Sequence, residues 1–328
     1  MTTAFDLFTA LMFVVAFAVR IAGSGWGWGG LFTRPTVKAE KHSLGIAEES
    51  AYIIIAGVLI NTMIVFVAGC FGLYSRTTDW VAWGILSAVG WVLRFVLEKK
   101  GKTTGGFYGF AVALCAVIAI SAAAMIMPRR GEWIVGGWDP GVYVNEGVAL
   151  SRTGTFNPPD TVFYLLTSDE QKAFSRTDKG RTERFPGVAA DFTNKTFRFQ
   201  FSRFTPSFIA FLHRCGGLRA ATRINLILGL LTLHILFVLI WKGSSIFCGY
   251  LAIFFLIMQP LFLYHTHLPV SEMFQLFWIL AAGLALVYRE NGINRRVLLP
   301  VVLMAGVLNR FIFLPFGAAF ILFSAWLD

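Results

Sequence analysis

The sequence predicts an all-α polytopic membrane protein with about eight or nine transmembrane helices and one large extracytoplasmic loop that carries amphipathic surface helices. The 328 residues are 56% hydrophobic and only 14% charged, whereas soluble globular domains carry about 25% charged residues. Apolar runs of about 20 residues, the length that crosses a bilayer, recur along most of the chain. This pattern excludes a soluble enzyme, a secreted disulfide scaffold and a disordered regulator.

The cysteines and the net charge narrow the class further. The four cysteines form no CxxC or Cys/His spacing, so no zinc site and no disulfide framework is expected. The formal charge is +10, but many basic residues flank apolar runs, where they set membrane orientation. We therefore expect no nucleic-acid partner.

Seven spans and a less regular apolar region are predicted along the chain. They lie at about residues 5–22, 50–73, 80–97, 106–127, 220–241, 245–264 and 270–288, with the irregular region at 297–327. The first run has no basic segment before it and no small-residue cleavage site after it, which favours a retained span over a signal peptide.

The irregular region is interrupted by Asn309 and Arg310. Val297 to Leu308 gives roughly 18 Å of helix, too short to cross a bilayer. Either one long helix carries a buried Asn-Arg pair, or two short halves meet at a polar bend. A charged residue at that depth must be paired or must line a wet cavity.

Basic residues in the short loops predict the orientation. Lysines and arginines concentrate in the loops 23–49, 98–105, 242–244 and 289–296. The positive-inside rule then places the N-terminus and the polar segment 128–218 on the non-cytoplasmic side. The expected parts are a four-helix membrane region at 1–127, an extracytoplasmic loop with a catalytic helix at 128–218, and a transmembrane region at 219–328.

Three features of the first membrane region have simple interpretations. Arg20 and Arg94 are expected to snorkel from the basic ends of their spans. The string from Gly25 to Gly30 satisfies GxGxxG, but no strand precedes it, so we interpret it as an interfacial Gly/Trp loop rather than a nucleotide site. Asn61, like His234 in a later span, is expected to form helix–helix hydrogen bonds.

The segment from Trp138 to Gly154 predicts a short helix along the outer membrane surface. Asp139 is a good N-cap, Pro140 a good first helical residue and Gly154 a good left-handed cap. One face would hold Tyr143, Gly147 and Leu150, and the other Asn145, Glu146 and Arg152. Asp139 is either a helix cap alone or a general base whose partial desolvation raises its pKa.

This segment and the stretch from Phe204 to Arg289 resemble the GT-C superfamily of membrane glycosyltransferases. The resemblance is to the bacterial branch related to protein O-mannosyltransferases and the lipid A aminoarabinose transferase. It rests on an ordered set of residues and segments: Asp139, Pro206, Arg219 with Arg223, Ser271-Glu272, and Gly306 to Pro315. Such enzymes carry further spans, so membership of this superfamily would make the chain a truncated form.

The resemblance implies transfer of a sugar, with inversion, from a polyprenyl-phosphate donor to a lipid, glycan or protein acceptor at a bacterial inner membrane. Asp139 would be the base. Glu272 either only caps its helix, or positions the acceptor, or shares a divalent metal with Asp139. The expected substrate-binding residues are Tyr143, Arg219, Arg223, His265, His267 and Arg310. The arginine side chain of Arg223 matches the oxygens of a phosphate. A snorkeling role stays open for both Arg219 and Arg223. The two histidines, at positions i and i+2, do not share a helix face.

Two other classes remain open at this point. Broken helices and a charge at mid-depth are also typical of transporters, so the chain could be a transporter subunit. It could also be a non-catalytic membrane scaffold in which the first four spans form an interaction module.

Overall fold

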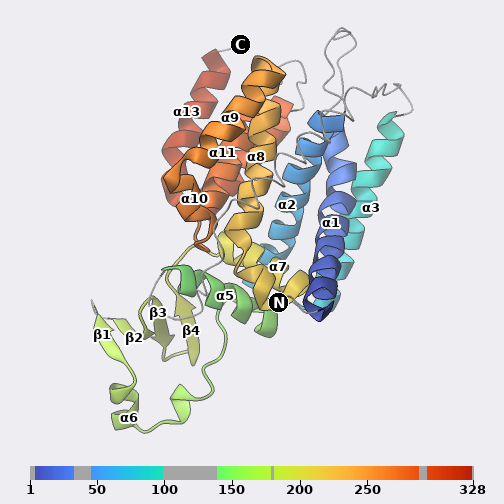
Figure 1. Ribbon diagram of the computed structural model, residues 1–328. Coiled ribbons are helices and arrows are strands. Elements are labelled where there is room, and N and C mark those ends of the chain that lie inside the picture. The colour runs from blue at the N-terminus through green and yellow to red at the C-terminus, as the bar shows by residue number, and fades with distance from the viewer. Residues whose placement is uncertain (1–3, 33–45, 99–138, 179–180, 288–293, 327–328) are drawn as a thin grey trace.

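The computed structural model describes residues 4–32, 46–98, 139–178, 181–287 and 294–326, and these are mostly helical (Figure 1). A first bundle consists of α1 (Ala4–Phe32), α2 (Ile46–Cys70) and α3 (Arg76–Glu98). Beside it stands a second group of helices. Its members are α8 (Ile224–Gly243), α9 (Ile246–Met258), α10 (Pro260–Thr266), α11 (Glu272–Val287), α12 (Leu299–Asn309) and α13 (Leu314–Trp326).

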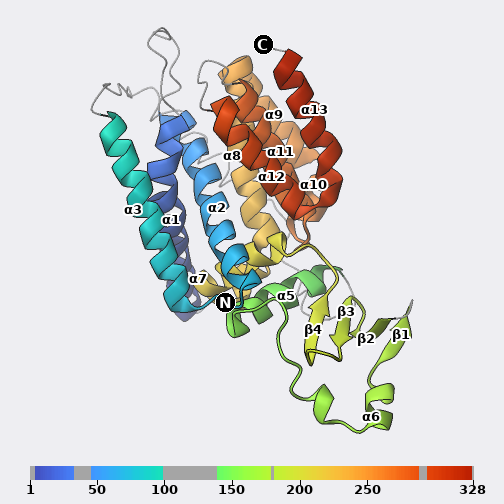
Figure 2. The same cartoon turned by 180° about the vertical axis from the view of Figure 1, so that it is seen from behind.

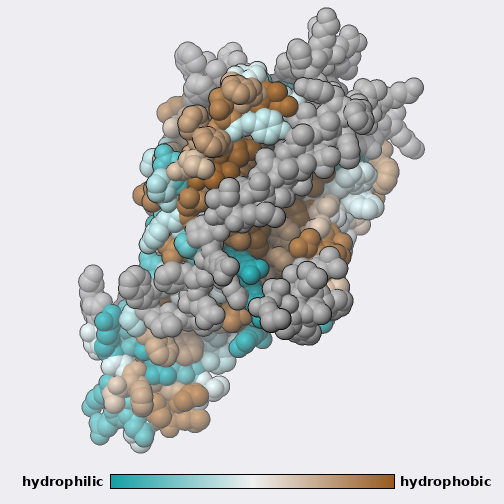
Figure 3. Space-filling model, in the orientation of Figure 1, coloured by the Kyte–Doolittle hydropathy of each residue, from teal (hydrophilic) through white to brown (hydrophobic). Residues whose placement is uncertain are grey.

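Two helices, α5 (Asp139–Thr153) and α7 (Phe204–Ala221), lie across one end of these bundles. Figures 1 and 2 show them between the upright helices and a small sheet that hangs below. In Figure 3, apolar side chains cover much of the upright helices, while polar side chains are more frequent over the lower part. The molecule therefore separates an apolar helical part from a more polar extension.

Three described helices are long and apolar enough to cross a membrane: Glu48–Cys70, Arg76–Val96 and Ile224–Gly243. The pair α9 and α10 would make a fourth if its halves, bent by 73°, are one span. The helical membrane class is thus supported, while the count of eight or nine spans stays a prediction. The predicted span 106–127 lies outside the described residues.

Two predicted spans are broken in the structure. The run 245–264 bends at Gln259, which has extended backbone angles (φ −73°, ψ 115°) before Pro260; proline disfavours a helical residue in front of it. The last region follows the second predicted alternative, since α12 ends at Asn309 and a short 3₁₀ helix, Phe311–Phe313, leads into α13. Arg310 between them is extended (φ −149°, ψ 129°).

Helix α1 corrects the prediction of a Gly/Trp loop after residue 22. It continues to Phe32, and at its glycines the neighbouring helices pack closely against it. A Cβ on Gly25 would lie 2.0 Å from the carbonyl oxygen of Ile53 in α2, and one on Gly27 would lie 2.5 Å from the backbone of Gly90 in α3. Small residues permit such close helix packing in membranes, so here the glycines support a helix.

The expectation that Arg20 and Arg94 snorkel is also wrong. Arg20 is buried and makes a bidentate pair with Asp79 at the start of α3, at 2.7 and 2.9 Å, while its Nε donates to Asn61. Arg94 is buried against Glu49 at 2.6 Å. The sequence placed both arginines near span ends, but their acidic partners come from other helices.

The predicted helix–helix roles of Asn61 and His234 are confirmed. The Asn61 amide donates to the backbone oxygens of Arg20 and Gly57. The ring of His234 in α8 is hydrogen-bonded to the hydroxyl of Ser50 in α2 at 2.8 Å.

A four-stranded antiparallel sheet in the loop region was not predicted. Its strands, in spatial order, are β1 (Arg176–Asp178), β2 (Arg181–Phe185), β3 (Val188–Asp191) and β4 (Thr196–Phe199). A 3₁₀ turn (Phe163–Leu165) and α6 (Ser168–Ala173) precede it. Gly187, at φ +79°, turns the chain between β2 and β3, a conformation that glycine adopts without strain.

Candidate functional site

Helix α5 forms as the sequence predicts. It starts at Asp139 with Pro140 next and ends at Thr153; Gly154 follows directly, has φ +79° and donates its N–H to the Leu150 carbonyl at 2.9 Å. Tyr143, Gly147 and Leu150 are buried. A Cβ on Gly147 would lie 2.5 Å from the Ile209 side chain, so this face packs directly on α7.

Glu146 departs from the prediction, because it is buried at 2% exposure rather than turned outward. Burial raises the pKa of Glu146 to about 8, and the positive charge of Arg203 opposes this rise only in part. Its Oε2 has no hydrogen-bond partner among the described residues. Helix α5 is therefore buried on more than the one face that the sequence periodicity predicts.

The hydroxyl of Tyr143 marks a place where three distant segments meet. Its ring stacks on Phe201 with 4.5 Å between centroids and an interplanar angle of 11°. Its hydroxyl donates to Oγ of Ser271 at 3.1 Å. Ser271 directly precedes Glu272, the first residue of α11, and Arg310 at the α12–α13 break donates to Oε1 of Glu272 at 2.5 Å. The start of α5, the start of α11 and the polar bend at Asn309 and Arg310 therefore lie close together.

The pKa of Tyr143 shows which charged groups influence its hydroxyl. Burial raises the pKa of Tyr143 to about 12, the largest influence being desolvation of the phenolate. The Ser271 hydrogen bond and the Arg310 charge lower this pKa, while the carboxylates of Glu272 and Asp139 raise it further. The two predicted acidic residues and Arg310 thus influence the pKa of one hydroxyl. Asp139 itself is exposed, whereas the general-base alternative supposed a partly desolvated carboxylate.

Buried hydrogen bonds hold the polar bend in place. Asn309 is fully buried; its amide donates to the Ser271 carbonyl at 3.1 Å and to Oε1 of Gln275 at 3.0 Å. Its Oδ1 accepts from Thr205 of α7 at 2.5 Å. Because Arg310 follows Asn309 directly, these bonds position the guanidinium. Thr205 and Gln275 could not be predicted as site residues, since nothing in their spacing distinguishes them from packing residues.

One face of α11 carries buried polar atoms that have no hydrogen-bond partner among the described residues. Oε2 of Glu272, Nε2 of Gln275 and Nε1 of Trp278 are all buried without a partner among the described residues. Residues three apart share a helix face, and this face begins at the carboxylate that Arg310 contacts. Buried polar atoms are normally satisfied, so these atoms are suited to a polar ligand. The N–H groups of Gln275 and Trp278 are donors, which match acceptor oxygens such as those of a phosphate.

The other predicted substrate-binding residues lie elsewhere. Arg219 is in the last turn of α7, beyond a kink at Gly216 and Gly217, and Arg223 stands directly before α8. Arg310 is a cation that lowers the pKa of Tyr143.

His265 lies on α10 and His267 directly after it. The carbonyl of His265 accepts from Asn225 of α8 at 3.1 Å. Across the described ranges, no group of three or more His, Cys, Asp or Glu side chains is placed to hold a metal ion.

No family model, characterised protein or solved structure matches the chain. The resemblance to GT-C glycosyltransferases therefore stays a prediction. What the structure defines is the class: a mostly helical chain with apolar helices long enough for a membrane and a polar site at their ends.

Proposed function

We propose that this protein is an inverting glycosyltransferase of GT-C type that moves a sugar from a polyprenyl phosphate to an acceptor on the non-cytoplasmic face of a bacterial inner membrane. The observation that carries the proposal is the arrangement of Asp139, Glu272 and Arg310 around Tyr143, at the ends of apolar helices. A carboxylate and a cation beside apolar surface are what transfer from a lipid phosphate requires.

The proposed chemistry assigns one role to each group. Asp139 removes the proton of the acceptor hydroxyl, whose oxygen attacks the anomeric carbon from the face opposite the phosphate. The bond from carbon to phosphate oxygen breaks, and polyprenyl phosphate leaves with both electrons. Arg310 stabilises the negative charge that develops on that phosphate. Glu272 contacts Arg310 and fixes its direction, so Glu272 is a positioning residue in this scheme.

Exposure of Asp139 fits a base that must receive its acceptor from the aqueous side. The lipid-linked donor would approach from the opposite direction, along the helices, with its phosphate beside Arg310, Gln275 and Trp278. The positive-inside distribution of the short loops supports a site on the non-cytoplasmic face.

A transporter subunit is the second candidate, and one observation favours it. The pair α9 and α10 is bent by 73°, and the junction between α12 and α13 carries the ion pair of Arg310 with Glu272. Transporters use such breaks to bind polar substrates.

Transfer by membranes that contain the protein discriminates the classes. Wild type, Asp139→Asn and Asp169→Asn are supplied with polyprenyl-phosphate sugars carrying a radiolabelled sugar. Asp169 lies in the same loop region with a 95% exposed side chain, so its variant is the matched control. The proposal expects transfer by wild type and by the control and its collapse in Asp139→Asn at unchanged thermal stability. Equal transfer by Asp139→Asn refutes the assignment, and movement of label across the membrane without transfer indicates the transporter.

A further inference from the structure

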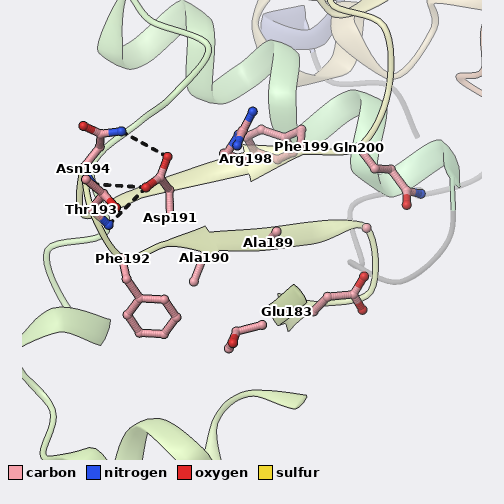
Figure 4. Close-up of a pocket in the computed structure, with 12 residues that line it drawn as sticks. Glu183, Ala189, Ala190, Asp191, Phe192, Thr193, Asn194, Arg198, Phe199 and Gln200 are labelled. Carbon is pink, nitrogen blue, oxygen red and sulfur yellow. Dashed lines mark hydrogen bonds between the residues drawn. The ribbon is translucent and has the colours of Figure 1, made fainter. Parts of the chain in front are cut away.

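The small sheet carries a cavity of about 720 Å³ that the proposed chemistry does not use. It is lined by parts of β2, β3 and β4 and by the turn between β3 and β4 (Figure 4). Its volume is in the range of ligand-binding clefts, about 300 to 1,000 Å³. We propose that this groove binds a hydroxyl-rich glycan chain, which is the acceptor of the transferase.

The strand register explains why a hollow forms there. Glu183 of β2 pairs with Ala189 of β3, and Ala189 pairs with Arg198 of β4. Directly paired residues stand on the same face of an antiparallel sheet. The methyl group of Ala189 therefore lies between two long charged side chains, and Gly187 at the end of β3 adds no side chain at all.

The polar groups around the groove include both donors and acceptors. Figure 4 shows Asp191, Thr193 and Asn194 together at one end and Gln200 at the other. The Asp191 carboxylate accepts from the N–H groups of Thr193 and Asn194 and is fixed by that turn. In contrast, the side chains of Arg198 and Gln200 make no hydrogen bond within the described part of the chain, and both are exposed, although the backbone N–H of Gln200 donates to Gly187. They remain available for a ligand.

This chemistry favours a glycan over a polypeptide. Peptides that bind to sheets usually add a strand at an edge and use its free N–H and C=O groups. The groove lies instead over strands whose backbone groups already pair with each other. Recognition must come from carboxylate, amide and guanidinium side chains, which hydrogen-bond hydroxyl groups, and from Phe192, half exposed at 50%, against which the apolar face of a sugar ring can pack.

The chain connects the groove directly to the proposed active site. Gln200 lines the groove, and the next residue, Phe201, stacks on Tyr143. At the same end, a Cβ on Gly187 would lie 2.9 Å from Val142 of α5. A chain bound in the groove would thus reach the start of α5, where Asp139 lies. Naming this glycan as the acceptor rests on the proposed function, whereas the binding itself does not.

Binding of defined oligosaccharides tests the inference. The full chain in lipid nanodiscs is titrated with cellohexaose, maltohexaose and hexagalacturonate, and with a Ser/Thr-rich peptide, by saturation-transfer NMR. The variants are Arg198→Ala with Gln200→Ala, and Lys172→Ala as the control, because Lys172 is 79% exposed and lies on α6 outside the groove. We expect at least one hexasaccharide to bind, with affinity lowered about tenfold in the double variant and unchanged in the control.

The outcomes separate this inference from the proposed function. Binding of a hexasaccharide that persists in Asp139→Asn and weakens in the double variant supports the groove even if no transfer is found. Failure of all three hexasaccharides to bind at millimolar concentration, or equal binding by wild type and the double variant, overturns the inference even if transfer occurs. Binding of the peptide alone overturns it in favour of a polypeptide ligand.

Discussion

Replacement of Glu146 by glutamine should change how the stability of the protein depends on pH. Burial raises the pKa of Glu146 from 4.5 to about 8. The folded protein therefore keeps a proton on this carboxyl over a pH range in which an exposed carboxyl has lost it. Because the folded pKa is raised, the stabilisation is fully present below pH of about 4.5 and is lost as pH rises towards 8.

The expected change in the free energy of unfolding follows from the size of this pKa shift. A shift of about 3.5 pKa units corresponds to about 5 kcal/mol, since each unit is 1.36 kcal/mol. Over two pH units inside that window the free energy of unfolding should fall by about 3 kcal/mol in wild type. Glutamine has nearly the same shape but does not titrate, so the free energy of unfolding of Glu146→Gln should not fall in this way. The difference in stability between the variant and wild type should therefore shift in favour of the variant between pH 5 and pH 8.

Thermal unfolding in detergent between pH 5 and 9, followed by tryptophan fluorescence, measures this difference. Asp169→Asn is the control, because its side chain is exposed and its curve should parallel that of wild type. Parallel curves for wild type and Glu146→Gln would refute the argument that burial of this carboxyl sets the pH dependence.

Three further substitutions test the packing and the polar bend. Gly25→Ala should sharply lower the melting temperature, because its Cβ would lie 2.0 Å from a backbone oxygen, whereas Gly84→Ala on α3 meets nothing within 4 Å and should be neutral or slightly stabilising. Asp79→Asn should cost about 3 to 5 kcal/mol by leaving a buried arginine unpaired; a loss below 1 kcal/mol in chemical unfolding would contradict this. Thr205→Val removes the hydroxyl that donates to Asn309, so donor affinity should weaken with α-helical content unchanged, as measured by donor titration and circular dichroism.

The sequence predicts those features that depend on local chemistry. Apolar runs identified helices, and the Asp139-Pro140 start and the Gly154 end of α5 are where capping preferences place them. The polar bend at Asn309 follows from a run too short to cross a bilayer. In each case the residues that decide the structure are neighbours along the chain.

Features that depend on the partner of a residue were missed. The glycines of α1 were taken as the sign of a loop because glycine disfavours isolated helices, but here close contact with α2 and α3 outweighs that preference. Glu146 was placed on an outward face because periodicity identifies one buried side only. The sheet escaped prediction because its strands have three to five residues and alternate charged with apolar side chains only briefly.

In the candidate site too, local sequence predicts some features, while others depend on contacts between distant segments. Residue types and order along the chain identified Asp139, Glu272, Tyr143 and Arg310. Which arginine reaches Glu272 depends on the paths of α7 and α12 through space. For this reason Arg223 looked the stronger phosphate ligand by sequence, while the structure brings Arg310 to Glu272.

The most direct test of the proposed mechanism is the rate and stereochemistry of transfer by purified protein in nanodiscs, with wild type compared to Asp139→Asn. The anomeric configuration of the product is read by NMR. The mechanism predicts an inverted product from wild type and a loss of rate of about 10² to 10⁴ in the variant, as expected when a general base is removed. A product of retained configuration, or equal rates for the two proteins, would contradict it.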